Sequence, residues 1–179
     1  MKVKREYQNL TKEQLLDKIY ELACDYEINA GSCSQSTVAA FHEVLGLDDS
    51  VVKVSTSLCG GVALQSIGTC GALSGGIMVL DYFFGRTVKE VQERDSFPIL
   101  LAQQVAKELF AKFLTKYHTV ICMGIIIQYY GRPYYFEDPD DAQELLELGT
   151  HSAEKCGGIV GQVARWVMEI LIEKGAVEV

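Results

Sequence analysis

Six cysteines are the residues of this sequence best suited to chemistry. They stand at positions 24, 33, 59, 70, 122 and 156 of a chain of 179 residues. A thiolate is both a nucleophile and a ligand for soft metal ions. No pair has the Cys-x-x-Cys spacing of zinc ribbons and thioredoxin-like proteins, and no Cys-x-x-Cys-His motif for haem attachment is present. Because the gaps are long, a site that uses several cysteines must be assembled by tertiary structure or across a dimer.

Three cysteines are predicted to lie in the first turn of a helix. Helical patterns begin close to Cys33, Cys70 and Cys156. The free N–H groups and the dipole of a helix N-terminus stabilise a thiolate and lower its pKa. We therefore expect these thiols to be activated as nucleophiles or ligands.

Glycines follow three of the cysteines directly, in the segments Cys59-Gly60-Gly61, Cys70-Gly71 and Cys156-Gly157-Gly158. Glycine lets a cofactor approach the backbone closely and leaves N–H groups free to bond sulfur. Gly60, Gly61 and Gly71 are therefore candidate cofactor-binding residues. The alternative is that the glycines permit tight helix packing and the cysteines are small buried hydrophobes. Cys24, on the apolar face of the first helix, is expected to be of this second kind.

Two histidines are further candidate ligands or proton carriers. His118 precedes Cys122 by one helical turn, and His151 stands five residues before Cys156. Their alternative role is that of surface or capping residues at helix ends. A nearby aromatic run, residues 129–136, lacks interleaved basic residues, so it indicates packing or a dimer surface rather than base stacking.

The elements that must position these residues are predicted to be helices. Apolar spacing and capping residues predict helices at 11–29, 32–46, 48–58, 70–84, 87–96, 101–114, 138–148 and from 153–156 to the end, with 118–127 ambiguous between strand and helix. No repeat and no βαβ alternation is found. We expect one all-α domain over residues 1–179, a helical bundle whose helix N-termini converge on the cysteines.

The composition of the chain restricts the kinds of molecule that it is expected to bind. The formal net charge of −8 disfavours nucleic acid and anionic membrane surfaces. The apolar stretches Ala72–Leu80 and Thr119–Ile127 are about half as long as the roughly 20 residues that a membrane span needs. Residues 1–11 lack the apolar core of an export signal, which predicts a cytoplasmic protein with reduced cysteines. Apolar helices and the aromatic run favour a homodimer.

The cysteine pattern resembles that of a known family. The segments Ser32-Cys33-Ser34-Gln35, Cys59-Gly60-Gly61 and Gly68-Thr69-Cys70-Gly71-Ala72-Leu73-Ser74-Gly75, followed by Cys122 and Cys156, are similar to the redox-active C_GCAxxG_C_C proteins. The resemblance covers residues 29–166 and extends to the amino-terminal part of split-Soret cytochrome c, where an iron–sulfur centre is bound. The haem-attachment region of that protein is absent here. The family name has Gly-Cys-Ala where this chain has Thr69-Cys70-Gly71-Ala72.

The resemblance implies that Cys33, Cys70, Cys122 and Cys156 are the cofactor or metal ligands, with Cys59 a fifth candidate. Three functional hypotheses follow. The first is a redox or electron-transfer protein that holds an iron–sulfur cluster or another thiophilic metal and serves a redox partner. The second is a metal-free thiol–disulfide switch. The third is a helical interaction protein with buried structural thiols. No feature of the sequence identifies a substrate.

Overall fold

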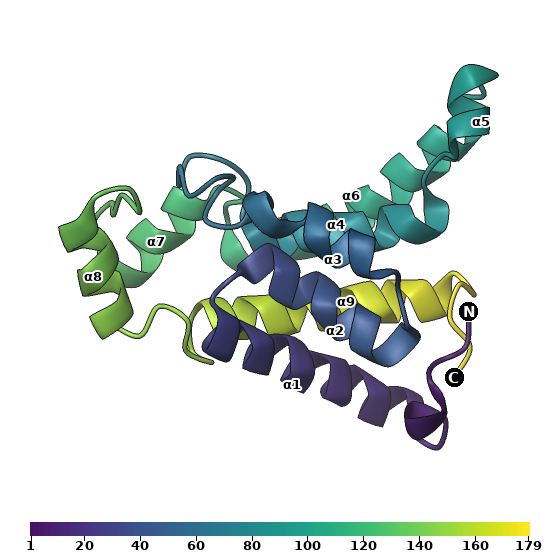
Figure 1. Cartoon of the computed structure of the whole chain (residues 1–179), viewed down its shortest axis with the longest axis horizontal. Coiled ribbons are helices and arrows are strands. Elements are labelled where there is room, and N and C mark those ends of the chain that lie inside the picture. The colour runs from purple at the N-terminus through teal and green to yellow at the C-terminus, as the bar shows by residue number, and fades with distance from the viewer.

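Helices account for all of the regular secondary structure in the computed structural model, which describes residues 1–179 (Figure 1). The α-helices are α1 (Lys12–Ala30), α2 (Cys33–Leu45), α3 (Asp49–Val54), α4 (Gly71–Phe84), α5 (Val88–Gln92), α6 (Phe97–Tyr117), α7 (Cys122–Tyr130), α8 (Pro139–Glu147) and α9 (Cys156–Glu173). Two 3₁₀ helices cover Arg5–Tyr7 and Thr56–Leu58. The all-α prediction is confirmed.

The ends of the helices follow the local sequence signals. The Thr11 side chain accepts a hydrogen bond from the backbone N–H of Gln14, and the Gln14 side chain accepts one from Thr11 in return. Gly31 and Gly46 end α1 and α2 in the left-handed conformation that glycine adopts without steric cost. Three predicted boundaries were wrong by several residues, because α3 and α5 are shorter and α6 is longer than the apolar spacing indicated.

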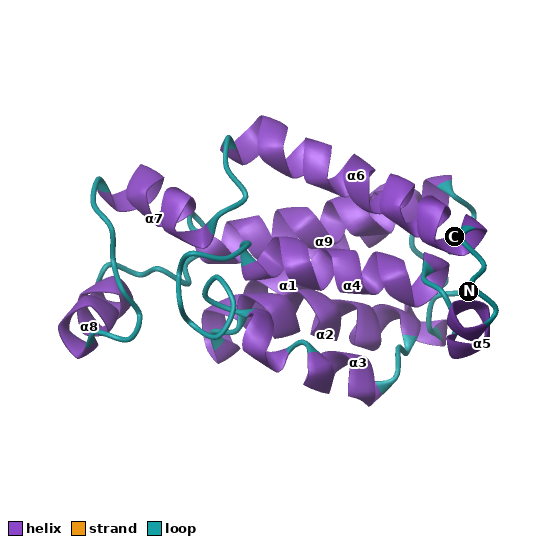
Figure 2. Cartoon of the chain, turned by 90° about the horizontal axis from the view of Figure 1, so that it is seen from above, coloured by secondary structure: helices purple, strands orange, loops and turns teal.

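Five helices form the bundle. Helix α9 packs against α1, α2, α4 and α6, and its buried face includes Val163 and Val167. These side chains belong to one contiguous apolar core with Ile19, Phe41 and Phe113. Seen from above, α1, α2, α4, α6 and α9 run alongside one another (Figure 2). This core gives the bundle its stability through burial of apolar surface.

The second region lies at one end of the bundle and comprises α7, α8 and the loops around them (Figures 1 and 2). Its own core is small and consists of Ile126, Tyr134 and Leu145. The segment that was ambiguous in the sequence divides in two. Ile121 is extended and forms an antiparallel bridge with Thr69, and helix α7 begins at the next residue.

The two chain termini lie side by side at the opposite end, where Lys2 pairs with Glu178. The apolar stretches within α4 and α7 are parts of short helices, and no helix is both long and apolar enough to cross a membrane.

Candidate functional site

Four of the cysteines stand at the starts of four different helices. Cys33, Cys122 and Cys156 are the first residues of α2, α7 and α9, and Cys70 is the N-cap of α4. The predicted positions of Cys33, Cys70 and Cys156 are confirmed. The helix start at Cys122 was not predicted, because the β-branched run around it does not distinguish helix from strand.

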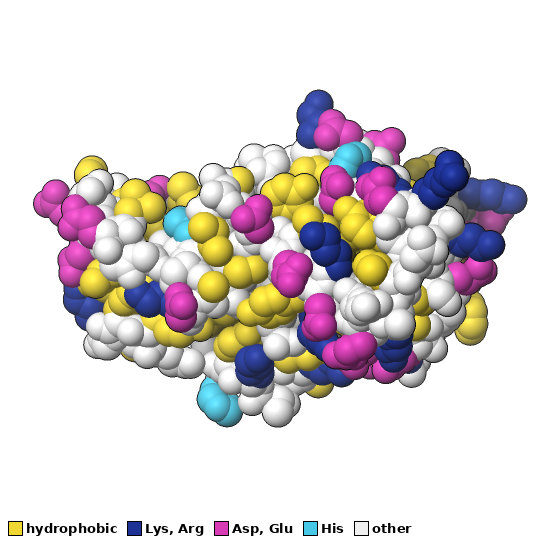
Figure 3. All heavy atoms as spheres, turned by 90° about the horizontal axis from the view of Figure 1, so that it is seen from below, with side chains coloured by type: hydrophobic (Ala, Val, Ile, Leu, Met, Phe, Trp, Pro, Cys, Tyr) yellow, Lys and Arg dark blue, Asp and Glu magenta, His cyan; other side chains and the backbone are white.

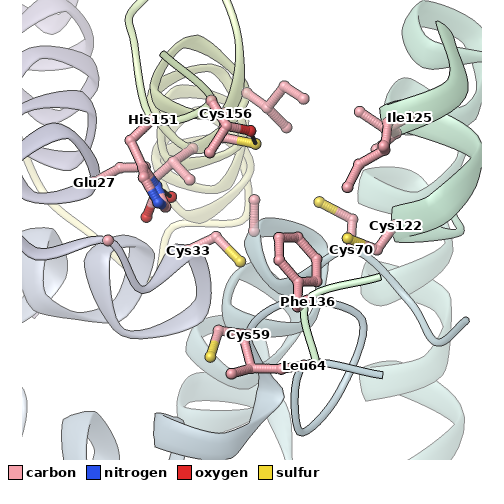
Figure 4. A pocket seen from close by; sticks show the side chains of 17 residues that line it. Glu27, Cys33, Cys59, Leu64, Cys70, Cys122, Ile125, Phe136, His151 and Cys156 are labelled. Carbon is pink, nitrogen blue, oxygen red and sulfur yellow. Dashed lines mark hydrogen bonds and ion pairs between the residues drawn. The ribbon is translucent and has the colours of Figure 1, made fainter. Parts of the chain in front are cut away.

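These helix starts surround a single cavity of about 120 Å³ (Figure 4). All four cysteines line it, as does Cys59, while Cys24 is buried elsewhere on α1. The sulfur of Cys59 points away from the other four sulfurs. The remaining lining residues are mostly apolar: Glu27, Gly31, Gly60, Leu64, Ala72, Ile125, Ile126, Phe136, Thr150, His151, Ile159 and Val160.

Glycine is required at Gly71 by close packing. A Cβ at this position would collide with the Cys33 sulfur and would lie 3.0 Å from the Cys59 Cα and the Leu58 carbonyl oxygen. Gly61 is similar, since its Cβ would lie 2.9 Å from the Cβ of Cys122. Gly60 lines the cavity itself, and its backbone N–H partly opposes the rise in the pKa of the Cys33 thiol. All three predicted glycines therefore lie beside the thiols.

The loop between Cys59 and Cys70 has an unusual backbone. Five consecutive residues, Gly60–Leu64, have φ between +50° and +71°, and Ser66 follows at +62°. Valine, alanine and leucine rarely adopt this left-handed conformation, since their Cβ approaches the following carbonyl. The loop is held by backbone bonds to the start of α7, because Cys122 donates its N–H to Gly68 and Met123 donates to Ser66.

The expectation that helix N-termini lower the thiol pKa values was wrong. Burial raises the pKa of Cys70 from 9.0 to about 11 and that of Cys156 to about 12. The pKa values of Cys33 and Cys122 are also raised, chiefly by burial and then by the neighbouring Cys70. N–H groups of Ala72 and Leu73 oppose the shift at Cys70 without reversing it. Desolvation exceeds the helix-end effect, so these thiols are protonated at neutral pH.

The structure separates the two candidate histidines. His151 lines the cavity, whereas His118 is an exposed residue that ends α6. The Nδ1 atom of His151 lies 2.8 Å from Oε1 of Glu27, a carboxylate whose residue is only 1% exposed. Sequence reasoning missed Glu27. The sequence did contain a signal that Glu27 is buried. Glu27 stands four residues after Ala23, so it lies on the apolar face of α1.

The arrangement does not contain a preformed site for a single metal ion. No three side chains among histidine, cysteine, aspartate and glutamate lie close enough together to hold one. The sulfurs surround the cavity instead of meeting at a point (Figure 4).

Comparison with known proteins gives one match. The family model described as "Putative redox-active protein (C_GCAxxG_C_C)" matches residues 31–170. No curated protein and no solved structure matched the chain. The matched residues include five of the six cysteines and span α2 to α9. The chain belongs to the C_GCAxxG_C_C family of redox-active proteins.

Proposed function

We propose that this chain is an electron-transfer protein that holds an iron–sulfur cluster on Cys33, Cys70, Cys122 and Cys156. The observation that carries the proposal is that four thiols from four helix starts surround one apolar cavity. Cysteine sulfur is the ligand of most iron–sulfur clusters, and N–H groups near the sulfurs adjust their reduction potential. Gly60, Ala72 and Leu73 offer such N–H groups to the thiols.

The spacing of the thiols favours a cluster over a single ion. A mononuclear zinc site needs all of its sulfurs about 2.3 Å from one point. No such convergence exists here. A cluster distributes its ligands over several iron atoms. A ring of thiols around a cavity therefore suits a cluster better than a single ion.

Charge supports the same conclusion. The four thiols face one another and Glu27 across an apolar space, and their raised pKa values keep them neutral. A cofactor with iron cations would favour the thiolates and release protons on binding. When bound, the cluster would supply a one-electron redox centre. The chain would supply the sulfur ligands, exclude water and hold the N–H groups in place.

The metal-free thiol–disulfide switch is the second candidate. The nearness of several thiols in one cavity favours it. The raised pKa values weigh against it, because only the thiolate attacks a disulfide. The third hypothesis, buried structural thiols, describes Cys24 well. It gives no reason for four other cysteines to share a cavity.

The homodimer, the redox partner and the cytoplasmic location stay predictions. Exposed apolar side chains at α5 and the start of α6, such as Val88, Phe97 and Leu100, support a dimer contact. On the face shown in Figure 3, hydrophobic side chains also lie among acidic and basic ones. Light scattering coupled to size exclusion would test the dimer.

The test of the cluster uses protein expressed and purified without oxygen. We expect iron and acid-labile sulfide in whole-number ratios to the chain, together with visible absorption. Single Cys→Ala changes at Cys33, Cys70, Cys122 or Cys156 should reduce both, whereas Cys24→Ala, a matched control outside the cavity, should not. A colourless, iron-free wild type would contradict the proposal. A reversible change of two free thiols in that protein would support the switch.

A further inference from the structure

One buried carboxylate and the histidine that it contacts have no role in the ligand set proposed above. Glu27 lies on α1 and is almost completely buried. It forms part of the wall of the cavity that the four cysteines line, called here the thiol cavity. Its Oε2 atom accepts a hydrogen bond of 3.2 Å from the Ser36 hydroxyl, and its Oε1 atom lies 2.8 Å from Nδ1 of His151. Burying a carboxylate is costly unless it is paired. An apolar residue would fill this position on α1 at lower cost.

The contact with Glu27 determines which histidine nitrogen is available. Because Nδ1 is engaged by the carboxylate, Nε2 is the free ring nitrogen, and no group of the chain hydrogen-bonds to it. The ring packs over Gly31, with Nε2 3.5 Å from where a Cβ of that residue would lie. Gly31 and His151 both line the cavity. The ring is therefore held between the carboxylate and Gly31 in the wall of the cavity.

This arrangement has a well-defined chemical meaning. Histidines that bind metals almost always donate their second ring N–H to a carboxylate, a carbonyl or water, which fixes the tautomer and strengthens the ligand. His151 and Glu27 show this relationship beside a set of sulfur ligands. His118 does not, because it lies outside the cavity.

We infer that Nε2 of His151 is a nitrogen ligand of the cofactor bound at the thiol cavity, and that Glu27 is its positioning residue. The inference rests on the proposed function and changes its donor set, because the imidazole takes the place of one of the four thiolates and leaves three sulfur ligands and one nitrogen ligand. A neutral imidazole in place of a thiolate raises the reduction potential of an iron–sulfur centre. Replacing His151 by cysteine should therefore lower that potential.

The test is pulsed electron paramagnetic resonance of the reduced, cofactor-loaded protein, labelled with ¹⁵N in histidine only. We expect a histidine nitrogen coupling in the wild type that disappears in His151→Cys, with a lower reduction potential. Glu27→Gln should keep the coupling and raise the potential, since it removes a negative charge but leaves an acceptor for Nδ1. Glu27→Ala, which removes the acceptor for Nδ1, should weaken the nitrogen coupling, and a coupling unchanged in that variant would show that Glu27 does not position the ring.

His118→Asn is the matched control, because asparagine tolerates the left-handed backbone at that position. Its nitrogen coupling and reduction potential should equal those of the wild type.

Two results would overturn the inference while leaving the proposed function intact: an iron-loaded wild type without nitrogen coupling, or coupling that persists in His151→Cys. If the protein holds no iron, the cluster proposal fails, and the histidine is tested with Cd²⁺ added to the reduced protein. A shift of the His151 Nε2 resonance in the ¹⁵N spectrum, absent in Glu27→Ala or much weaker there, supports a nitrogen ligand. An unchanged resonance while Cd²⁺ binds the thiols, or no Cd²⁺ binding, overturns it.

Discussion

The five-helix bundle and the region around the cysteine cavity, called here the thiol end, are stabilised in different ways. The thiol end comprises α7, α8, the loops around them and the cavity itself. The bundle is held by interdigitated apolar side chains of α1, α2, α4, α6 and α9 around one large core. The thiol end has a core of only three residues and is assembled from helix starts, backbone hydrogen bonds and a left-handed loop. One end gains stability from packing. The thiol end loses some stability, because burying thiols and a carboxylate and holding a strained backbone all cost free energy.

This difference indicates how the site is maintained. The cysteines are fixed at the starts of helices whose remaining lengths, in α2, α4 and α9, belong to the bundle core. The bundle therefore holds three of the four thiols in position without a cofactor. Only Cys122 depends on the smaller region, through α7. Experiments that weaken one end at a time would show how independent the two ends are.

The largest effect is expected in the bundle. Phe41→Ala removes a fully buried side chain from α2 and should cost about 3–5 kcal/mol of unfolding free energy. Urea unfolding of the cofactor-free protein would measure it. Val54→Ala, at a valine that is 68% exposed on α3, is the control and should change stability by less than about 0.5 kcal/mol. Phe136 is partly buried at the thiol end, so the loss of unfolding free energy in Phe136→Ala should lie between those of the other two variants. A loss at Phe136 as large as that at Phe41 would contradict the contrast between the two ends.

The next effect falls on the thiol end. Gly71→Ala places a methyl group against the Cys33 sulfur and the Cys59 backbone, and such overpacking costs about 1–3 kcal/mol. We expect a larger fractional loss of bound iron than of stability, because the cavity itself is deformed. Iron content and urea unfolding would be measured together. Ser74→Ala in the same helix serves as the control. Normal iron content in Gly71→Ala would show that the glycine is not part of the cofactor site.

The pH dependence of stability should also separate the two ends. Burial raises the pKa of Cys70 from 9.0 to about 11, so the folded state binds more protons than the unfolded state between these values. The folded state therefore has its full stability below pH 9. Its free energy of unfolding then falls by about 1 kcal/mol per pH unit for this one thiol as the pH rises towards 11. Urea unfolding of cofactor-free protein between pH 8 and 10 should show this slope. Cys70→Ser should reduce it, and an identical slope in that variant would assign the effect elsewhere.

The smallest effect concerns the loop. Ala63 has φ of +50°, so Ala63→Gly should relieve strain and stabilise the protein by at most about 1 kcal/mol. Ala111→Gly on the exposed face of α6 is the opposite control and should destabilise by about 1 kcal/mol. Thermal unfolding of both variants gives the comparison. Destabilisation by both changes would mean that the loop backbone is not strained at this position.

Sequence reasoning located most of the bundle, since caps such as Thr11 and Gly31 and apolar spacing are local signals. It also placed Cys33, Cys70 and Cys156 at helix starts. What it could not supply depends on tertiary structure. The direction of the thiol pKa shifts follows from burial, which no helix-end rule reveals.

Three other features of the thiol end lay outside local sequence rules. The pairing of Glu27 with His151 joins residues that are 124 positions apart. No propensity rule assigns left-handed backbone to Val62 or Leu64. The choice between the two histidines required the positions of both relative to the cavity. Each of these features is set by long-range packing rather than by neighbours in the chain.

The left-handed run at Gly60–Leu64 has a consequence for chirality. A φ near +60° is favoured by D-amino acids, because it is the mirror image of the φ that L-amino acids prefer. Cysteines 59 and 70 flank the loop, and each is a junction at which synthetic peptides can be ligated. A semisynthetic protein with D-alanine at position 63 would therefore retain the loop with less strain, whereas a D-alanine inside α4 would destabilise that helix.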